Sequence, residues 1–273
     1  MGVQMREEIL TQLCAIEADD GVRILYACES GSRAWGFPSP DSDYDVRFIY
    51  LRPRDWYLSI DLEHKRDVIE CPIDGMLDIT GWDLRKALRL LRNSNPPLIE
   101  WLGSPVVYWD KYEIRSRMHA LAARYHSPKS CAHHYLHMAH GNFRDYLEGP
   151  MIKYKRYFYV LRPILAINWI ERDMGVMPTE FARLAAAVVD DPELRAAIDR
   201  LLADKLASNE RDLRPRIEPL SAFIESELAR LEQAVLEDGF ARPAVPVDEF
   251  NALFRAALDE VWSRTACVVN AGG

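Results

Sequence analysis

The feature that most constrains the fold is a pair of aspartates in a run of strand-forming residues. The segment from Asp43-Tyr44-Asp45 to Leu51 is rich in aromatic and β-branched residues, which predicts a strand. Alternate side chains of a strand share one face, so Asp43 and Asp45 project together. Two neighbouring carboxylates repel each other unless a cation neutralises them. Magnesium prefers hard oxygen ligands, so the pattern predicts a divalent-metal site.

A glycine-serine turn precedes this strand. The short apolar run Arg23–Cys28 suits a buried strand, and Ser30-Gly31-Ser32 follows it before a short helix expected from about Ser32. Glycine lets the backbone approach a phosphate, and N–H groups at a helix start bind anions. A Gly-Ser turn or an Asp-x-Asp is by itself usually only a turn or a solvated loop. Their order along the chain favours a nucleoside triphosphate site.

A third carboxylate is expected on a later strand. The sequence predicts strands around Val68-Ile69 and around 76–79. Asp78 lies between Leu77 and Ile79, which would face the opposite way. Asp78 therefore completes a predicted three-carboxylate site with Asp43 and Asp45.

Helical patterns dominate the rest of the chain. A helix is expected after Thr80, ending at the breaker segment 93–97, and helical character prevails from about residue 111 onward. Segment 151–172 is strongly amphipathic, and Pro163 should kink or interrupt it. The composition changes near residue 110, which predicts two domains, 1–110 and 111–273.

Composition excludes several classes of protein. A formal net charge of −8 argues against nonspecific coating of nucleic acid, although a local basic patch could still hold one nucleic-acid end. The five cysteines are scattered and form no CxxC pair, so neither a disulfide framework nor a thiolate zinc site is encoded. No apolar window is long enough for a membrane span, and the N-terminus lacks a secretory signal. The chain reads as cytoplasmic.

Four segments carry a resemblance to a known family. Gly31-Ser32 with Ser42-Asp43-Tyr44-Asp45 resembles the signature of the polymerase-beta-like nucleotidyltransferase superfamily. With Gly31–Gly36, Asn95–Pro105 and Lys155–Pro163, the chain is similar to the RNA-repair-pathway polymerase-beta-like family over roughly residues 20 to 185. This resemblance implies an α+β fold: a nucleotidyltransferase core with a mixed sheet flanked by helices, then an all-helical domain that closes over the nucleotide. It also implies that Asp43, Asp45 and Asp78 bind magnesium, with manganese as the alternative cation.

Basic and aromatic residues alternate in a predicted helix. Lys155, Tyr159 and Arg162 fall at i, i+4 and i+7 and so share one face. The face would suit phosphates and a base, but an ordinary amphipathic helix with snorkelling cations gives the same pattern. The resemblance favours triphosphate contacts. The predicted nucleotide-binding set is Gly31, Ser32, Arg33, Ser42, Lys155, Tyr159 and Arg162.

Two further patterns favour structural interpretations. His133, His137 and His140, with His134 beside them, share a helical spacing that can hold zinc, but no HExxH motif or nearby carboxylate completes a site. Polar residues facing solvent or a nucleotide are the favoured explanation. Asn95 is expected to cap a helix that carries Trp101 in the core and Glu100 behind the site.

The combined hypothesis is transfer of a nucleoside monophosphate from a triphosphate to an acceptor hydroxyl, with an RNA end as the favoured acceptor. A protein hydroxyl or a small molecule is the alternative acceptor. Metal-assisted phosphoester hydrolysis, and a nucleotide-binding or antitoxin-like partner without catalysis, are rival functions. The helical half could also support a homo-oligomer.

Overall fold

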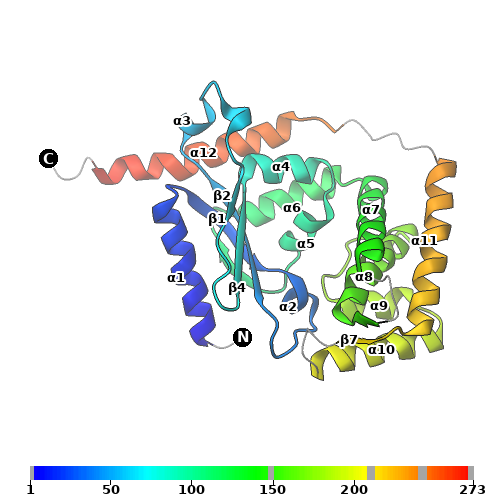
Figure 1. Cartoon of the computed structure of the whole chain (residues 1–273). Helices are drawn as coiled ribbons and strands as arrows, with labels where there is room; N and C mark the ends of the chain where they lie inside the picture. Colours follow the sequence, from blue (N-terminus) through cyan, green and yellow to red (C-terminus); the bar gives the residue numbers. More distant parts are fainter. Residues whose placement is uncertain (1–2, 147–150, 208–212, 239–244, 270–273) are drawn as a thin grey trace. The chain divides into compact units, whose positions relative to one another are not determined.

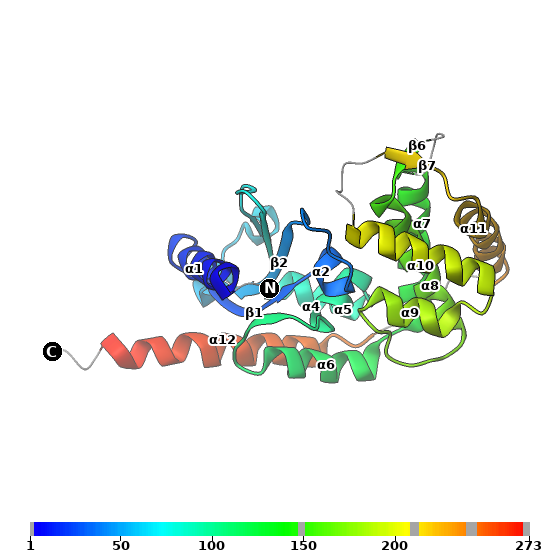
Figure 2. The ribbon, with the colours of Figure 1, turned by 90° about the horizontal axis from the view of Figure 1, so that it is seen from below.

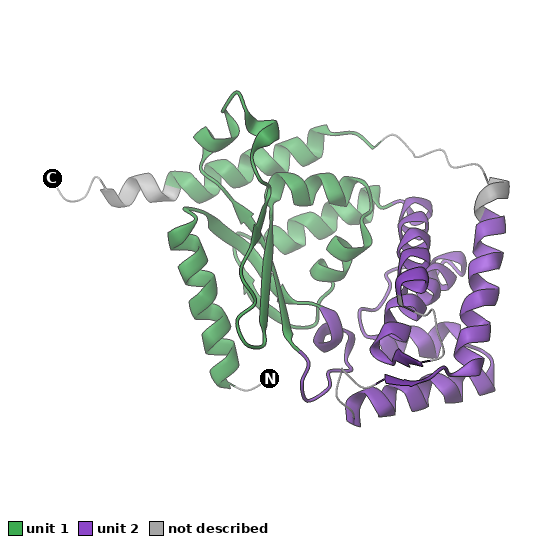
Figure 3. Cartoon of the chain, viewed as in Figure 1, with its two compact units in different colours: residues 1–30, 43–126, 244–273 green, residues 31–42, 127–243 purple. Residues whose placement is uncertain are grey.

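The computed structural model describes residues 3–146, 151–207, 213–238 and 245–269, with side chains given up to residue 263 in the last range (Figure 1). The chain divides into two compact units (Figure 3). The sheet unit comprises residues 1–30, 43–126 and 244–273, and the helical unit comprises residues 31–42 and 127–243. The division differs from the single boundary expected near residue 110.

The sheet unit is built on a five-stranded mixed sheet in the order β3-β4-β2-β1-β5. Strand β2 pairs parallel with β4 and antiparallel with β1, while β3 and β5 pair antiparallel at the two edges. This arrangement confirms the expected α+β fold with a mixed sheet flanked by helices. The strands are β1 (Arg23–Glu29), β2 (Tyr44–Leu51), β3 (Val68–Glu70), β4 (Leu77–Asp83) and β5 (Val107–Asp110).

Helices cover both faces of the sheet (Figures 1 and 2). On one face α1 (Val3–Asp19) packs Ile9 and Leu13 against a cluster that contains Val46 and Phe48. The helices of the other face bury apolar residues against Ile49 and Leu51 of β2. They are α4 (Leu84–Arg92), α5 (Pro96–Leu102), α6 (Ile114–Tyr125) and α12 (Asp248–Val269). Between β2 and β3 the chain forms α3 (Arg54–Tyr57) and a 3-10 turn (Leu62–His64).

Burial explains why α6 belongs to the sheet unit, beyond the expected boundary. Its residues Ile114, Met118 and Leu121 are buried in the cluster beneath the sheet. Helix α12 also belongs to the sheet unit, although it lies far beyond residue 126, and it buries Phe250 and Val261 in the same cluster. A shift in composition along the chain does not reveal such long-range packing.

Strand β4 extends further than the sequence indicated. It continues through Thr80 to Asp83, where a helix had been expected to begin after Thr80. A Cβ built on Gly81 would come within 2.1 Å of the ring of Phe48, the paired residue on β2. Only glycine admits the ring this closely, so Gly81 lets the strand continue beside Phe48. Asp83 ends the strand and caps α4 by accepting the Arg85 N–H at 2.8 Å.

The helical unit contains α2 (Gly31–Trp35) from the inserted segment and five longer helices. These are α7 (Pro128–Tyr146), α8 (Lys155–Glu171), α9 (Phe181–Val188), α10 (Pro192–Ala207) and α11 (Glu218–Asp238). Pro163 lies inside α8 without interrupting it. A two-stranded antiparallel sheet of β6 (Met151–Lys153) and β7 (Leu213–Pro215) is an addition to the helical pattern expected here.

In the described part of the chain, none of the helices combines the length and hydropathy that crossing a membrane requires. No disulfide joins the four cysteines whose side chains are described. The side chain of Cys267 lies outside the described residues.

The buried Asp83 carboxyl predicts a pH dependence of stability. Burial raises the pKa of Asp83 to about 6, against the opposing effect of hydrogen bonds from Tyr57 and the Arg85 N–H. Between pH ~4 and ~6 the folded chain therefore binds more protons at this site than the unfolded chain, and stability falls as pH rises. In the wild-type chain we expect the free energy of unfolding to decline by about 1–3 kcal/mol between pH ~4 and ~6 because of this group. Asp83→Asn, which keeps the capping oxygen, should abolish this decline.

Urea unfolding at pH 4, 5, 6 and 7 measures this effect. The control is Asp55→Asn, a change at an exposed position in α3, which should keep the decline of the wild-type chain. Equal pH profiles for Asp83→Asn and wild type would contradict the assignment.

Candidate functional site

The polar end of the β2–β4 pair brings two of the predicted carboxylates together. Asp45 and Asp78 occupy paired positions in the parallel register of β2 and β4. Ile49 and Leu51 follow Asp45 on the same face of β2 and enter the core, whereas Asp45 and Asp78 keep 27% and 31% of their side chains exposed. The strands therefore hold two carboxylates side by side at a partly solvated edge of the core.

Arg47 lies between these carboxylates. One terminal nitrogen of its guanidinium is 3.1 Å from Asp45 Oδ1 and 2.8 Å from Asp78 Oδ2. The other terminal nitrogen donates to the Asp78 carbonyl at 2.8 Å. Sequence analysis missed Arg47, although the period of the strand places it on the face of Asp43 and Asp45. One cationic side chain therefore contacts both carboxylates, and offsets part of their charge, where the sequence predicted a metal.

The donor set fits a divalent cation in its chemistry. Asp45 Oδ1 and Asp78 Oδ2 converge on a single nitrogen, so the same two oxygens can converge on a metal ion. Asp43 is exposed and directly precedes β2, on the same alternation as Asp45. Among the described side chains, no three histidines, cysteines or carboxylates meet as ready metal ligands. The three-carboxylate site with Asp43 therefore stays a prediction.

A buried carboxylate supports Asp45 from the other side of the backbone. Glu29 is 1% exposed, and its Oε1 accepts the Asp45 N–H at 2.9 Å. Its second oxygen accepts the Tyr108 hydroxyl, and burial together with this carboxylate raises the pKa of Tyr108 far above its ordinary value. The polar Cys28-Glu29-Ser30 stretch was the only signal in the sequence for this contact. Ser30 also donates its N–H to the Asp45 carbonyl at 2.8 Å.

The segment between β1 and β2 belongs to the helical unit. Gly31 has φ +56°, a left-handed conformation that favours glycine, as the predicted turn requires. Ser32 and Arg33 follow in α2, which is only five residues long. Arg33 donates to the Ser42 carbonyl at 2.7 Å and thereby closes the segment into a loop.

A buried lysine fixes the end of this loop, which sequence analysis did not identify. Lys205 of α10 is 3% exposed and donates from Nζ to Ser39 Oγ at 2.7 Å and to Ser42 Oγ at 3.3 Å. The two hydroxyls are 2.9 Å apart. Ser42 was expected to bind the nucleotide, but its side chain is fully buried in this cluster. These contacts hold the loop just before Asp43, and nucleotide binding by Ser42 stays a prediction.

The predicted basic face of α8 packs on the same loop. Trp35 meets the Tyr159 ring edge-on at 5.8 Å, and Phe37 stacks on Phe158 at 4.1 Å. Arg162 lies over the Trp35 ring at 5.0 Å and donates to the Thr179 carbonyl at 3.3 Å.

The three predicted residues of α8 differ in exposure. Arg162 is 1% exposed and lies against Trp35, and its contact with a phosphate stays a prediction. Lys155 is partly buried at the helix start, and Tyr159 is 38% exposed. These two remain candidates for contact with a nucleotide.

The histidines lie on α7, with a carboxylate near one of them that the sequence did not indicate, and Asn95 lies at the start of α5. His133 Nε2 and His137 Nε2 are 3.2 Å apart on α7, and His140 Nε2 is 3.2 Å from Glu232 Oε1. Asn95 Oδ1 caps α5 by accepting the Leu98 N–H at 3.2 Å, as expected. The buried Trp101 stacks on Trp82 with ring centres 3.8 Å apart. Glu100 lies partly buried on the same helix.

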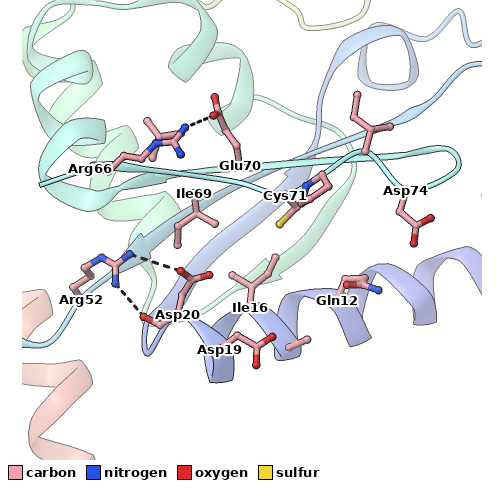
Figure 4. A pocket seen from close by; sticks show the side chains of 14 residues that line it. Gln12, Ile16, Asp19, Asp20, Arg52, Arg66, Ile69, Glu70, Cys71 and Asp74 are labelled. Carbon is pink, nitrogen blue, oxygen red and sulfur yellow. Dashed lines mark hydrogen bonds and ion pairs between the residues drawn. The ribbon is translucent and has the colours of Figure 1, made fainter.

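A cavity of about 780 Å³ lies on the α1 side of the sheet unit, between α1 and β3 (Figure 4). Its lining excludes Asp43, Asp45 and Asp78. Both arginines in it are bound to neighbouring carboxylates, Arg52 to Asp20 and Arg66 to Glu70. The arginines of this cavity are thus paired and acidic residues outnumber them, so we do not assign the nucleotide to it.

Comparisons with known proteins identify a matching family model and similar proteins. A family model described as the RNA repair pathway DNA polymerase beta family matches residues 5–256. The uncharacterized protein YcgL of Bacillus subtilis (strain 168) is 46% identical over 258 residues, which covers 94% of this chain and 98% of that protein. A crystal structure of a nucleotidyltransferase-like protein from Exiguobacterium sibiricum 255-15 aligns over 96% of this chain and 92% of its own, with 12% identity and a TM-score of 0.36.

The shared guanidinium predicts competition between Arg47 and a metal ion. Arg47→Met leaves two adjacent carboxylates without their cation, so we expect a loss of about 1 kcal/mol in stability, or ~2–4 °C in Tm. Added magnesium should then raise the Tm of Arg47→Met more than that of the wild type, because no guanidinium competes for the two oxygens. Thermal unfolding with and without magnesium measures both effects. Arg54→Met, which removes an exposed pair with Asp259, is the control. An identical magnesium response in all three proteins would contradict the prediction.

The Lys205 cluster predicts a second effect on stability. Lys205→Met leaves the buried hydroxyls of Ser39 and Ser42 without their ammonium donor, which should cost about 1–3 kcal/mol. Calorimetry should show a lower Tm, whereas Arg200→Met, at an exposed position of the same helix, should leave the Tm within about 1 °C. A wild-type Tm for Lys205→Met would show that the cluster does not hold the loop.

Proposed function

The chain belongs to the RNA repair pathway DNA polymerase beta family, and from that premise we propose that it transfers a nucleoside monophosphate from a nucleoside triphosphate to an acceptor hydroxyl, with an RNA end as the acceptor. One observation carries the proposal. Asp45 and Asp78 lie in register on neighbouring parallel strands, with oxygens that converge on a single cationic nitrogen. Two converging carboxylates can hold a divalent cation, and that cation would neutralise the phosphates of a triphosphate.

Asp43, Asp45 and Asp78 would hold the divalent cation, magnesium or manganese. When bound there, the cation would neutralise the phosphates and lower the pKa of the acceptor hydroxyl. Glu29 holds the backbone of Asp45 through its N–H and so keeps this carboxylate at the end of β2. Arg47 contributes a permanent positive charge between the two strands.

Residues of the inserted segment and of α8 would bind the triphosphate. Gly31 admits a close backbone approach, Ser32 offers a hydroxyl, and Arg33 and Lys155 offer positive charge. Tyr159 supplies an exposed ring for the base or sugar. Ser42 and Arg162 act indirectly, since they hold the loop and Trp35 from buried positions.

The reaction would be an in-line displacement at the α-phosphorus. The acceptor oxygen forms a bond to phosphorus while the bond to the bridging oxygen of pyrophosphate breaks. The proton of the acceptor hydroxyl passes to Asp78 as general base, and pyrophosphate leaves with the electron pair.

The test is label transfer from each α-labelled triphosphate, with magnesium and separate RNA, protein and small-molecule acceptors. Asp45→Asn and Asp78→Asn should each lower the rate by at least about 100-fold, because they remove charge from the cation site. Glu63→Gln, an exposed neutralisation in the same unit, should leave the rate unchanged.

Two outcomes would contradict the proposal. One is transfer that survives the substitution of both aspartates in a chain that remains folded by circular dichroism. The other is pyrophosphate release that is equally fast without any acceptor, which would indicate hydrolysis. Label on a protein or a small molecule instead of RNA would replace the proposed acceptor.

A further inference from the structure

Helix α4 carries a strong local positive charge in a chain with net charge −8. Its nine residues include Arg85, Lys86, Arg89 and Arg92 and no acidic residue. Three of these cations, Arg85, Arg89 and Arg92, recur at i, i+4 and i+7 and therefore share one face. Seven residues of helix rise about 10 Å, so this face is long enough for more than one phosphate of a polynucleotide strand.

This cationic face borders a cavity of about 410 Å³ between α4 and α12. The side of α12 contributes Phe250, Phe254 and the exposed amide of Asn251. The remaining lining residues are aliphatic, and among the described residues no carboxylate lines the cavity. The volume lies in the range of sites that hold small ligands, such as a single nucleotide unit.

The charges of this cavity contrast with those of the cavity in Figure 4. There each arginine is bound to a carboxylate of the same lining. Here the Arg89 guanidinium makes no hydrogen bond or ion pair within the described ranges, and it is exposed. Arg92 donates Nε to the Val245 carbonyl at 2.8 Å, and Arg85 has only a loose pair with Glu63 at 3.8 Å. The positive charge is therefore available to an external anion.

We propose that the α4–α12 groove binds a single-stranded nucleic acid, with phosphates on Arg85, Arg89 and Arg92 and a base against Phe254. A row of cations beside aromatic side chains is the combination that holds single strands, because phosphates need positive charge and every base has a face that stacks. Phe254 is partly exposed and is held edge-on by Tyr57 at 5.0 Å, which fixes its ring. Asn251 can bond to a base edge.

The groove is distinct from the carboxylate site. Asp83, which caps α4, lies five positions after Asp78 along β4, a distance of about 16–17 Å. A nucleotide at the carboxylates therefore does not fill the groove, and a strand bound in the groove is a separate ligand. The inference rests on the proposed function only for the idea that this strand is the acceptor; the binding itself stands without it.

The experiment measures fluorescence anisotropy of a labelled 12-nucleotide single-stranded RNA with the full chain, without triphosphate or metal, at several salt concentrations. The variant Arg89→Glu/Arg92→Glu should weaken binding at least 10-fold and make the salt dependence shallower by about one to two ion equivalents. Arg255→Glu is the matched control, because Arg255 is an exposed arginine on α12 outside the groove lining. It should bind nearly as the wild type.

Asp45→Asn separates this inference from the proposed function. This variant should bind the RNA as tightly as the wild type even if it no longer transfers a nucleotide. That result would support the groove as an RNA site without supporting the proposed transfer reaction. The inference is overturned if Arg89→Glu/Arg92→Glu binds like the wild type, or if Arg255→Glu weakens binding equally, which would indicate net charge only. Full displacement of the RNA by a free mononucleotide at similar concentration would also overturn it, because a mononucleotide would then be the occupant.

Discussion

The contact on which the rest of the sheet unit depends is the one that Arg47 makes with Asp45 and Asp78. The two aspartates are paired residues of the parallel β2–β4 pair in the interior of the sheet. Without a cation, their mutual repulsion would oppose the register that the strands otherwise adopt. The guanidinium touches both carboxylates and the Asp78 carbonyl, so it stabilises the register and the charge at once. A lysine has no planar fork and could not make all three contacts in the same way.

The strands that carry the polar residues of the candidate site also carry core residues. The inner residues of β2, from Phe48 to Leu51, are fully buried, whereas Asp45 and Arg47 near the start of the strand are only partly buried. Glu29 and Tyr108 close the other side of this end with buried polar contacts. The rigid part of the strand therefore fixes the direction of the carboxylates, and its edge leaves them accessible.

Local pattern was enough to predict β1, the α2 turn, β2 and the cap of α5, because each depends on neighbouring residues in the chain. The alternation of β2 and β4 also placed Asp45 and Asp78 at partly exposed positions. Local sequence pattern did not predict features that depend on contacts between residues far apart in the chain. Strand β4 outlasts its expected end because Gly81 lies under Phe48, and Ser42 is buried because Lys205 reaches it from a helix more than 160 residues away in the chain.

The net charge of the sequence likewise does not show where charged side chains gather on the folded chain. A net charge of −8 is an average, and it correctly excludes a chain that is basic throughout. A ligand, however, meets only the groups within about one Debye length, roughly 8–10 Å at moderate salt. Three cations of α4, Arg85, Arg89 and Arg92, line the groove, whereas Lys86 is paired with Asp67. The aromatic side chains beside them come from α12, over 150 residues later. The arginines can be read from the sequence, but their position beside aromatic rings depends on the fold, which gives the acidic chain a local surface suited to an anionic strand.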